Sequence, residues 1–248
     1  MMTFDYNAFV GTWPFYKTRF GSFSDLRLLH RENGIEGGLV SSIQAIFYND
    51  PWEAEEELAK TLHNDPNYRH VFTINPQLPA WKEDISRAVS MFGIYGVRIV
   101  PGYHRYEMDD PCLDELCTVL KKYQLPLFIT MHLIDERAAY LMLPHQVEID
   151  KLSGFIRKSG IRTMICNARV HELHALWPLV EEGYDIWFDM SGLKDQIFVM
   201  EDLFQKGMCT RLKYGSQMPI LCLQSSKLLL DLACIPDEVK EQILSDQF

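Results

Sequence analysis

The chain has 248 residues, of which 47% are hydrophobic, and it carries a formal net charge of −10 at pH 7. This acidic balance argues against general binding to nucleic acid or to an anionic membrane surface. No apolar run approaches the ~18 residues that a membrane span needs, and no linker or low-complexity segment divides the sequence, so we expect a single domain over residues 1–248.

Short apolar segments alternate with longer amphipathic segments along the whole chain. Strands are predicted at 3–9, 37–43, 69–75, 95–100, 126–133, 161–167, 184–190 and 211–216. Helices are predicted at 24–33, 51–64, 80–91, 111–124, 146–159, 170–182, 195–206, 220–233 and 236–246. Aspartate directly before proline marks two of the helix starts, at Asp50–Pro51 and Asp110–Pro111.

Strands that alternate with helices indicate a parallel sheet. Eight such units in a chain of this length predict an α/β fold, a single (β/α)8 TIM barrel. A doubly wound open sheet is the alternative, but no Gly-x-Gly-x-x-Gly follows the first strand.

The six cysteines form no Cys-x-x-Cys pair. A chain this long builds its core without disulfides, so we interpret them as reduced thiols of a cytoplasmic protein. The first residues, MMTFDYNAF, lack the basic and apolar regions of a secretory signal. We predict no cofactor, and the sequence leaves the formation of homo-oligomers open.

Side chains alternate between the two faces of a strand, so the sequence also predicts which residues point into the barrel. In the fifth strand, Phe128, Thr130 and His132 are expected inside, with Leu127 and Ile129 outside under the helices. The same count places inside the residues Asp5, Asn7 and Phe9 of the first strand and Arg98 of the fourth.

Polar residues gather toward the carboxyl ends of the predicted strands, where the sites of barrel enzymes lie. They are Asn7, Arg98, His132, Asn167, Asp189, Ser191 and Gln217. Any one of them could be a buried group bonded to a neighbour, but so many at one end favour a ligand site.

Arg98 has two interpretations. A buried arginine is unfavourable unless it is paired or binds an anionic ligand. It could form an internal ion pair with Asp5 or Asp189, or it could bind a carboxylate or a developing oxyanion.

His132 is the best candidate for acid–base chemistry, because its ordinary pKa lies near neutrality, and Asp135 or Glu136 could orient it. The candidate catalytic residues are therefore His132, Arg98, Asp135 and Glu136. The candidate substrate-binding residues are Asn7, Tyr103, His104, Arg137, Asn167, Asp189, Ser191 and Gln217.

Seven segments point to one known family. In chain order they are FDYNAFVG, YGVRIVPGYHRYEMDDPCLDEL, YQLPLFITMH, IRTMICNA, YDIWFDMSG, YGSQMP and IPDEVKEQILSDQF. In this order and at these spacings they resemble the amidohydrolase-related branch of the metal-dependent hydrolases over nearly the whole chain. The resemblance implies a (β/α)8 barrel with its site at the carboxyl-terminal mouth.

The family holds one or two divalent ions with histidines and a final aspartate, and this chain departs from that pattern. The matching positions hold Asn7, Phe9, Thr130, Asn167 and Gln217. Phenylalanine has no donor atom, and amide oxygens are poor ligands for zinc. We therefore predict no metal, and a ring of amides that either binds a polar ligand or satisfies itself.

A non-standard metal site through His104, His132 or Glu136 stays open as an alternative. The resemblance and the basic residues near the mouth predict a metal-independent hydrolase for a small anionic substrate, of carboxylate or lactone type. The alternatives are a catalytically silent relative that binds a metabolite and a decarboxylase or hydratase variant of the same barrel.

Overall fold

The structure, a computed structural model, describes residues 2–134, 142–194 and 196–248. In this part of the chain, parallel strands pair in sequence order from first to last. They are β1 (Phe4–Val10), β2 (Gly37–Ser42), β3 (Tyr68–Thr73), β4 (Gly96–Ile99), β5 (Leu127–Thr130), β6 (Thr163–Cys166), β7 (Ile186–Asp189) and β8 (Leu212–Lys213).

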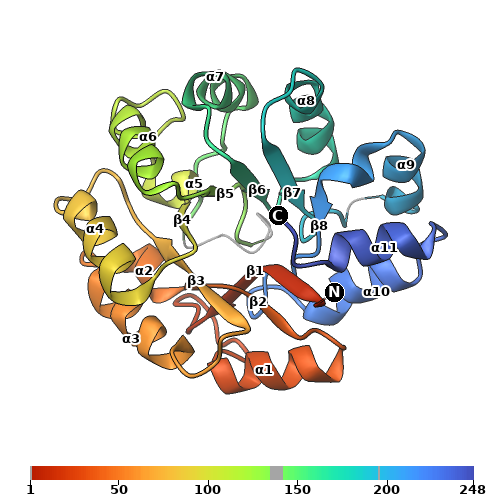
Figure 1. Ribbon diagram of the computed structural model, residues 1–248, viewed down its shortest axis with the longest axis horizontal. Coiled ribbons are helices and arrows are strands. Elements are labelled where there is room, and N and C mark those ends of the chain that lie inside the picture. Colours follow the sequence, from red (N-terminus) through yellow and green to blue (C-terminus); the bar gives the residue numbers. More distant parts are fainter. Residues whose placement is uncertain (1, 135–141, 195) are drawn as a thin grey trace.

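Backbone hydrogen bonds between β1 and the chain that follows β8 close the sheet on itself, among them one from Phe9 to the carbonyl of Met218 at 2.8 Å. Tyr6 donates to the carbonyl of Tyr214 at 2.8 Å, and Gln217 donates to the carbonyl of Asn7 at 2.6 Å. These bonds join β1 to the chain that follows β8, so the predicted (β/α)8 barrel is confirmed over the open sheet (Figure 1). The regular part of β8 is shorter than predicted, and Gln217 leaves the extended conformation with a left-handed φ of 53°.

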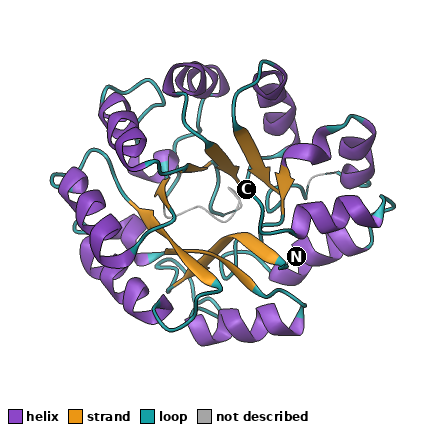
Figure 2. Ribbon diagram, viewed as in Figure 1, coloured by secondary structure: helices purple, strands orange, loops and turns teal. Residues whose placement is uncertain are grey.

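The helices form a ring around the strands (Figure 2). They are α1 (Phe23–Glu32), α2 (Gln44–Phe47), α3 (Trp52–Leu62), α4 (Trp81–Phe92), α5 (Pro101–His104), α6 (Cys112–Tyr123), α7 (Ile149–Ser159), α8 (Val170–Glu181), α9 (Val199–Gln205), α10 (Leu223–Asp231) and α11 (Asp237–Leu244), with a 3-10 helix η2 (Met208–Arg211). Each predicted helix is present, although α7, α9 and α10 begin about one turn late. The short α2 and α5 were not expected.

The predicted helix starts after aspartate are confirmed within a residue. Asp50 accepts a hydrogen bond from the backbone N–H of Trp52 at 3.0 Å, and Asp110 accepts one from Cys112 at 3.0 Å. Each carboxylate thus satisfies a backbone donor that the first turn of a helix leaves free.

The strands present one face to the helices and one to the barrel axis. Leu127 and Ile129 pack in the outer core with Leu116 of α6. Phe128 packs in a separate inner cluster with Phe4, Tyr6, Leu39, Val71, Met164 and Cys166. The predicted alternation in β5 is therefore confirmed, and burial of each large apolar side chain contributes roughly 1.5–3 kcal/mol.

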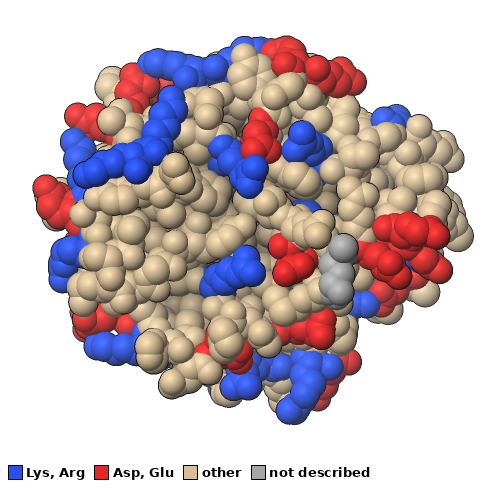
Figure 3. Space-filling view, in the orientation of Figure 1, with Lys and Arg blue, Asp and Glu red and all other residues tan. Residues whose placement is uncertain are grey.

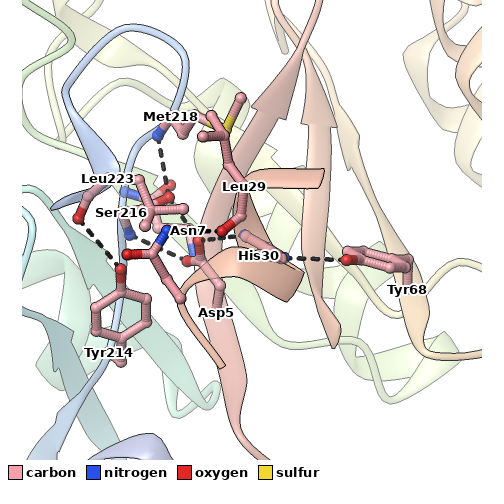
Figure 4. A network of polar contacts seen from close by, with 10 residues as sticks. Asp5, Asn7, Leu29, His30, Tyr68, Tyr214, Ser216, Met218 and Leu223 are labelled. Carbon is pink, nitrogen blue, oxygen red and sulfur yellow. Dashed lines mark hydrogen bonds and ion pairs between the residues drawn. The ribbon is translucent and has the colours of Figure 1, made fainter. Parts of the chain in front are cut away.

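The first strand breaks this alternation. The register between β1 and β2 shifts between Asp5 and Ala8, so Tyr6 and Asn7 both lie on the inner side while Ala8 packs in the outer core. The Asp5 carboxylate instead lies 3.1 Å from Nε2 of His30 on α1 and accepts from the backbone N–H of Ser216 at 3.0 Å (Figure 4). The prediction that Asp5 projects inside is wrong, because an irregularity in a strand reverses the face of the residues before it.

Aromatic side chains fill the amino end of the barrel. The Phe248 ring lies 5.6 Å from Tyr6, 6.1 Å from Phe128 and 5.6 Å from Trp187, measured between ring centroids. Figure 1 shows the C-terminus in the middle of the ring of strands. The polar residues of the strands are found toward the other end, as barrel enzymes arrange them.

Charges of both signs are interspersed over the face of the molecule that Figure 3 shows, without a continuous basic field. Within the described ranges, no helix has the length and apolar character to cross a lipid bilayer.

Candidate functional site

Arg98 lies at the centre of the carboxyl end of the barrel and is fully buried. Its Nε donates to the hydroxyl of Ser41 at 2.8 Å, and its Nη1 donates to the hydroxyl of Thr130 at 2.8 Å. Its guanidinium carbon lies 4.5 Å from the centroid of the Phe9 ring. Nη2 has no hydrogen-bond partner among the residues that the structure describes.

The internal ion pair considered for Arg98 does not form within the described ranges. Asp5 contacts His30 and Ser216, as shown above. Asp189 accepts from the Ser191 hydroxyl at 2.8 Å and from the backbone N–H of Asn167 at 2.6 Å. Among the described residues, Arg98 is therefore a buried cation without a carboxylate in contact, which is an uncommon arrangement.

Burial raises the pKa of Asp189, although the hydrogen bonds from Asn167, Ser191 and Asn7 and the charge of Arg98 act against this shift. The Asp189 carboxyl group therefore keeps its proton up to a higher pH than an exposed aspartate does.

The structure brings the predicted amides together. Nδ2 of Asn7 lies 3.4 Å from Oε1 of Gln217, and Asn167 and Gln217 both donate to the carbonyl of His132, at 2.7 and 3.1 Å. Gln217 also donates to the carbonyl of Leu133 at 2.7 Å. Of the two alternatives for this ring, hydrogen bonding within the protein applies to Asn167 and Gln217, whose NH2 groups donate to the backbone that follows β5. We call these three hydrogen bonds the amide ties.

Asn7 keeps some freedom within the ring. Its Nδ2 donates to the Ser191 hydroxyl at 3.3 Å, whereas its Oδ1 has no partner among the described residues. Its side-chain carbonyl is therefore a free acceptor beside the amide ties.

His132 follows β5 and pairs with a residue that the sequence did not suggest. Its Nε2 lies 2.8 and 3.1 Å from the two carboxylate oxygens of Glu172, the third residue of α8. Glu172 also accepts from the backbone N–H of Arg169 at 2.8 Å, which completes a capping box. Burial alone would raise the pKa of Glu172, but the hydrogen bond and charge of His132 lower it overall.

The sequence contained a signal for Glu172, namely an acidic residue three positions after the start of the helix that follows strand six. Asp135 and Glu136, which were expected to orient His132, lie outside the described residues, and so does Arg137.

Tyr103 and His104 belong to α5, beside the mouth. The Tyr103 ring packs edge-on against Trp13 and Phe47, with centroids 5.9 and 5.8 Å away, and burial raises its pKa. Nε2 of His104 donates to the carbonyl of Ile46 at 2.9 Å. Burial lowers the pKa of His104 to about 4, against the effect of that hydrogen bond.

A cluster of apolar side chains covers this end of the barrel. We call it the mouth cluster, and its buried members are Phe9, Trp13, Ile43, Ile46, Val100, Tyr103, Leu133, Ile134 and Ile220. Trp13 Nε1 and the Tyr103 hydroxyl in this cluster have no partner among the described residues. The site therefore combines an apolar cover with unpaired polar atoms.

The described residues do not fit a divalent metal ion. No three His, Cys, Asp or Glu side chains among them are arranged to hold one. Thr130 accepts from a guanidinium, so a second cation beside it would be repelled. Of the non-standard candidates, His104 and His132 each have Nε2 engaged, and Glu136 lies outside the described residues.

Comparison with known proteins supports the fold. No family model matches the sequence, and no curated protein matches it. Among solved structures, 5-carboxyvanillate decarboxylase from Sphingomonas paucimobilis has a TM-score of 0.73 at 14% identity, covering 98% of this chain and 96% of that one. A 2,6-dihydroxybenzoate decarboxylase from Rhizobium has a TM-score of 0.69 at 12% identity, covering 98% and 95%.

A 2-pyrone-4,6-dicarboxylic acid hydrolase candidate from Acinetobacter baumannii, with citric acid bound, is also similar. It has a TM-score of 0.71 at 11% identity, and the match covers 99% of this chain and 97% of that chain. The chain therefore has the barrel fold of amidohydrolase-related enzymes, both decarboxylases and hydrolases. At these identities the likeness is one of fold.

Proposed function

We propose that the chain is a metal-independent hydrolase that acts on a small substrate with an anionic group, of carboxylate or lactone type. The observation that carries this proposal is Arg98, a fully buried guanidinium without a contacting carboxylate and with Nη2 unpaired among the described residues. A buried cation of this kind gains most from an anionic ligand or a developing oxyanion. The acids in the names of the structural relatives support the same substrate class.

The roles of the side chains follow from their contacts. Arg98 would stabilise the oxyanion that forms when water attacks the substrate carbonyl. Glu172 engages Nε2 of His132, so Nδ1 would take the proton from the attacking water and return it to the leaving alkoxide. A lactone is reactive enough for positioning and charge stabilisation to suffice in such a reaction.

Ligand access requires movement. Arg98 is enclosed, so a ligand reaches Nη2 only when part of the mouth cluster moves aside. Binding energy would then be spent on opening the site, which lowers the apparent affinity.

A second candidate function is ligand binding without turnover. The amide ties favour it, because they use the NH2 groups of Asn167 and Gln217 within the protein. Gln217 also stands where the resembling family has its final aspartate, and a glutamine amide cannot act as a general base. In this case the ligand would stabilise the fold, and no product would form.

The test is a screen of carboxylated lactones and esters that measures kcat/KM and the shift in melting temperature for the same compounds. We expect R98M and H132N each to reduce kcat/KM at least ~100-fold, as loss of an oxyanion contact or a general base does. The matched control is R31M, which removes an exposed arginine of α1. Stabilisation that depends on Arg98, without product, would support the second candidate. Turnover as fast in R98M as in the wild type would refute the first candidate, and ligand stabilisation as large in R98M as in the wild type would refute the second.

A further inference from the structure

Every described side chain that contacts the Arg98 guanidinium through a hydrogen bond or a ring face is neutral. Ser41 and Thr130 accept its Nε and Nη1 protons, and the Phe9 ring lies against it. Hydroxyl oxygens and an aromatic face stabilise a buried cation without cancelling its charge. A carboxylate in either hydroxyl position would instead close the site with an ion pair.

The two hydroxyls also determine the orientation of the guanidinium. The Ser41 hydroxyl donates its one hydrogen to the carbonyl of Val71 at 2.8 Å, so it must accept from Nε of Arg98. Thr130 comes from β5, on the other side of β4 from Ser41 on β2. Because guanidinium is planar, bonds at Nε and Nη1 fix its plane and therefore the position of Nη2.

We infer that Thr130, together with Ser41 and Phe9, is a positioning residue for Arg98, and that a neutral side chain at position 130 keeps the guanidinium charge available to the anionic group of the ligand. This inference rests on the proposed function. It makes residue 130 the position that decides whether the barrel mouth accepts an anion.

The experiment compares three variants at one position. T130V removes the hydroxyl and keeps the shape, T130S keeps the hydroxyl, and T130D adds a carboxylate beside the guanidinium. Side-chain N–H signals of Arg98 are followed by NMR in 15N-labelled protein and assigned by their absence in R98M. Sodium acetate is the anionic probe, with sodium chloride at equal ionic strength for comparison. T118V, on the exposed surface of α6, is the matched control.

In the wild type and T130S we expect separate, slowly exchanging Nη signals. In T130V these signals should broaden and merge, because the bond that restrains Nη1 is gone. Acetate affinity measured by calorimetry should fall about tenfold in T130V, the usual effect of losing a hydrogen bond to a charged group. It should fall at least ~100-fold in T130D, whose aspartate would occupy the guanidinium.

Arg98 signals and acetate affinity that are unchanged in T130V would overturn the inference. If T130D does not fold, T130V still decides it, since valine keeps the shape of threonine and lacks only the hydroxyl, while T130S tests whether the hydroxyl suffices without the methyl group. If acetate leaves the wild-type Arg98 signals unmoved and stabilises R98M equally, the proposed function fails. The Nη signals of T130V, measured without acetate, separately report whether Thr130 positions Arg98.

Discussion

His104 has a buried imidazole with only one of its two nitrogens hydrogen-bonded to a described residue. Nε2 donates to Ile46, and Nδ1 is enclosed without a partner among the described residues. A second proton on Nδ1 would place an uncompensated charge in the protein, which is why burial lowers the pKa to about 4 from the ordinary 6.5. These contacts suit a link between α5 and α2, while the predicted role in substrate binding stays a prediction.

His104 should make stability depend on pH in a defined window. The unfolded chain takes up a proton near pH 6.5 and the folded chain only near pH 4, so the stabilisation is present above pH 6.5 and is lost as the pH falls through this range. Between pH 6.5 and pH 4, the unfolding free energy of the wild type should fall by on the order of 3 kcal/mol more than that of H104Q. Urea denaturation at several pH values measures it, with H63Q at an exposed site as the control. A curve for H104Q that parallels the wild type would contradict the assignment.

Glu172 gives a linkage of the same sign as His104, in a lower range of pH. Its pKa is lowered overall by His132, so the pairing stabilises the fold above the ordinary pKa of 4.5, and this stabilisation is lost as the pH falls through the lowered value. H132N should therefore be less stable than the wild type at pH 6 and should approach it at low pH. It should also raise the pKa of Glu172, which 13C NMR of the carboxyl carbon measures. A Glu172 titration unaffected by H132N would show that the two residues do not pair in solution.

The segment after β5 is held by side chains that follow two other strands. Asn167 follows β6 and Gln217 follows β8, and both have left-handed φ values, 55° and 53°. Residues other than glycine seldom adopt this conformation. It is stable here because it allows both amides to reach the carbonyls of His132 and Leu133.

Q217A should release this segment. Two amide ties disappear and two buried carbonyls lose donors, so we expect a loss of about 1–3 kcal/mol in unfolding free energy. Amide hydrogen exchange at residues 131–134 should become faster. Q124A is a matched control, because Gln124 also has a left-handed φ, 55°, but lies exposed at the end of α6. Equal effects of the two substitutions would attribute the loss to backbone conformation and not to the ties.

The barrel is closed by aromatic packing at its amino end. The Phe248 ring contacts Tyr6, Phe128 and Trp187, and Arg162 donates to the Phe248 carbonyl at 3.1 Å. F248A should cost about 1–3 kcal/mol, since the ring is only partly buried. It should also change the fluorescence of Trp187. F204A, at a more exposed ring of α9, is the control, and an unchanged melting temperature for F248A would refute the packing role.

The fold was predictable from the sequence because its signals are repeated along the chain. Apolar runs alternate with amphipathic segments, aspartate before proline marks two of the helix starts, and the alternation in β5 placed Phe128 and Thr130 correctly inside the barrel. The gathering of Asn7, Asn167 and Gln217 followed from the same topology, since parallel strands end at one edge.

The details of the site were less accessible, for local and long-range reasons. The irregularity in β1 that turns Asp5 toward His30 leaves no mark in a pattern of period two. The partner of His132 comes from 40 residues away, on a helix where Glu172 also completes the capping box. A local pattern cannot show that one carboxylate serves both purposes.

The amide ties also limit how this sequence can change over generations. Replacing Asn167 or Gln217 by a side chain without an NH2 group removes a donor from the carbonyl of His132. Each such replacement should therefore lower stability on its own. Substitutions at these two positions should consequently be tolerated only together with changes in the segment after β5 that supply another donor to its carbonyls.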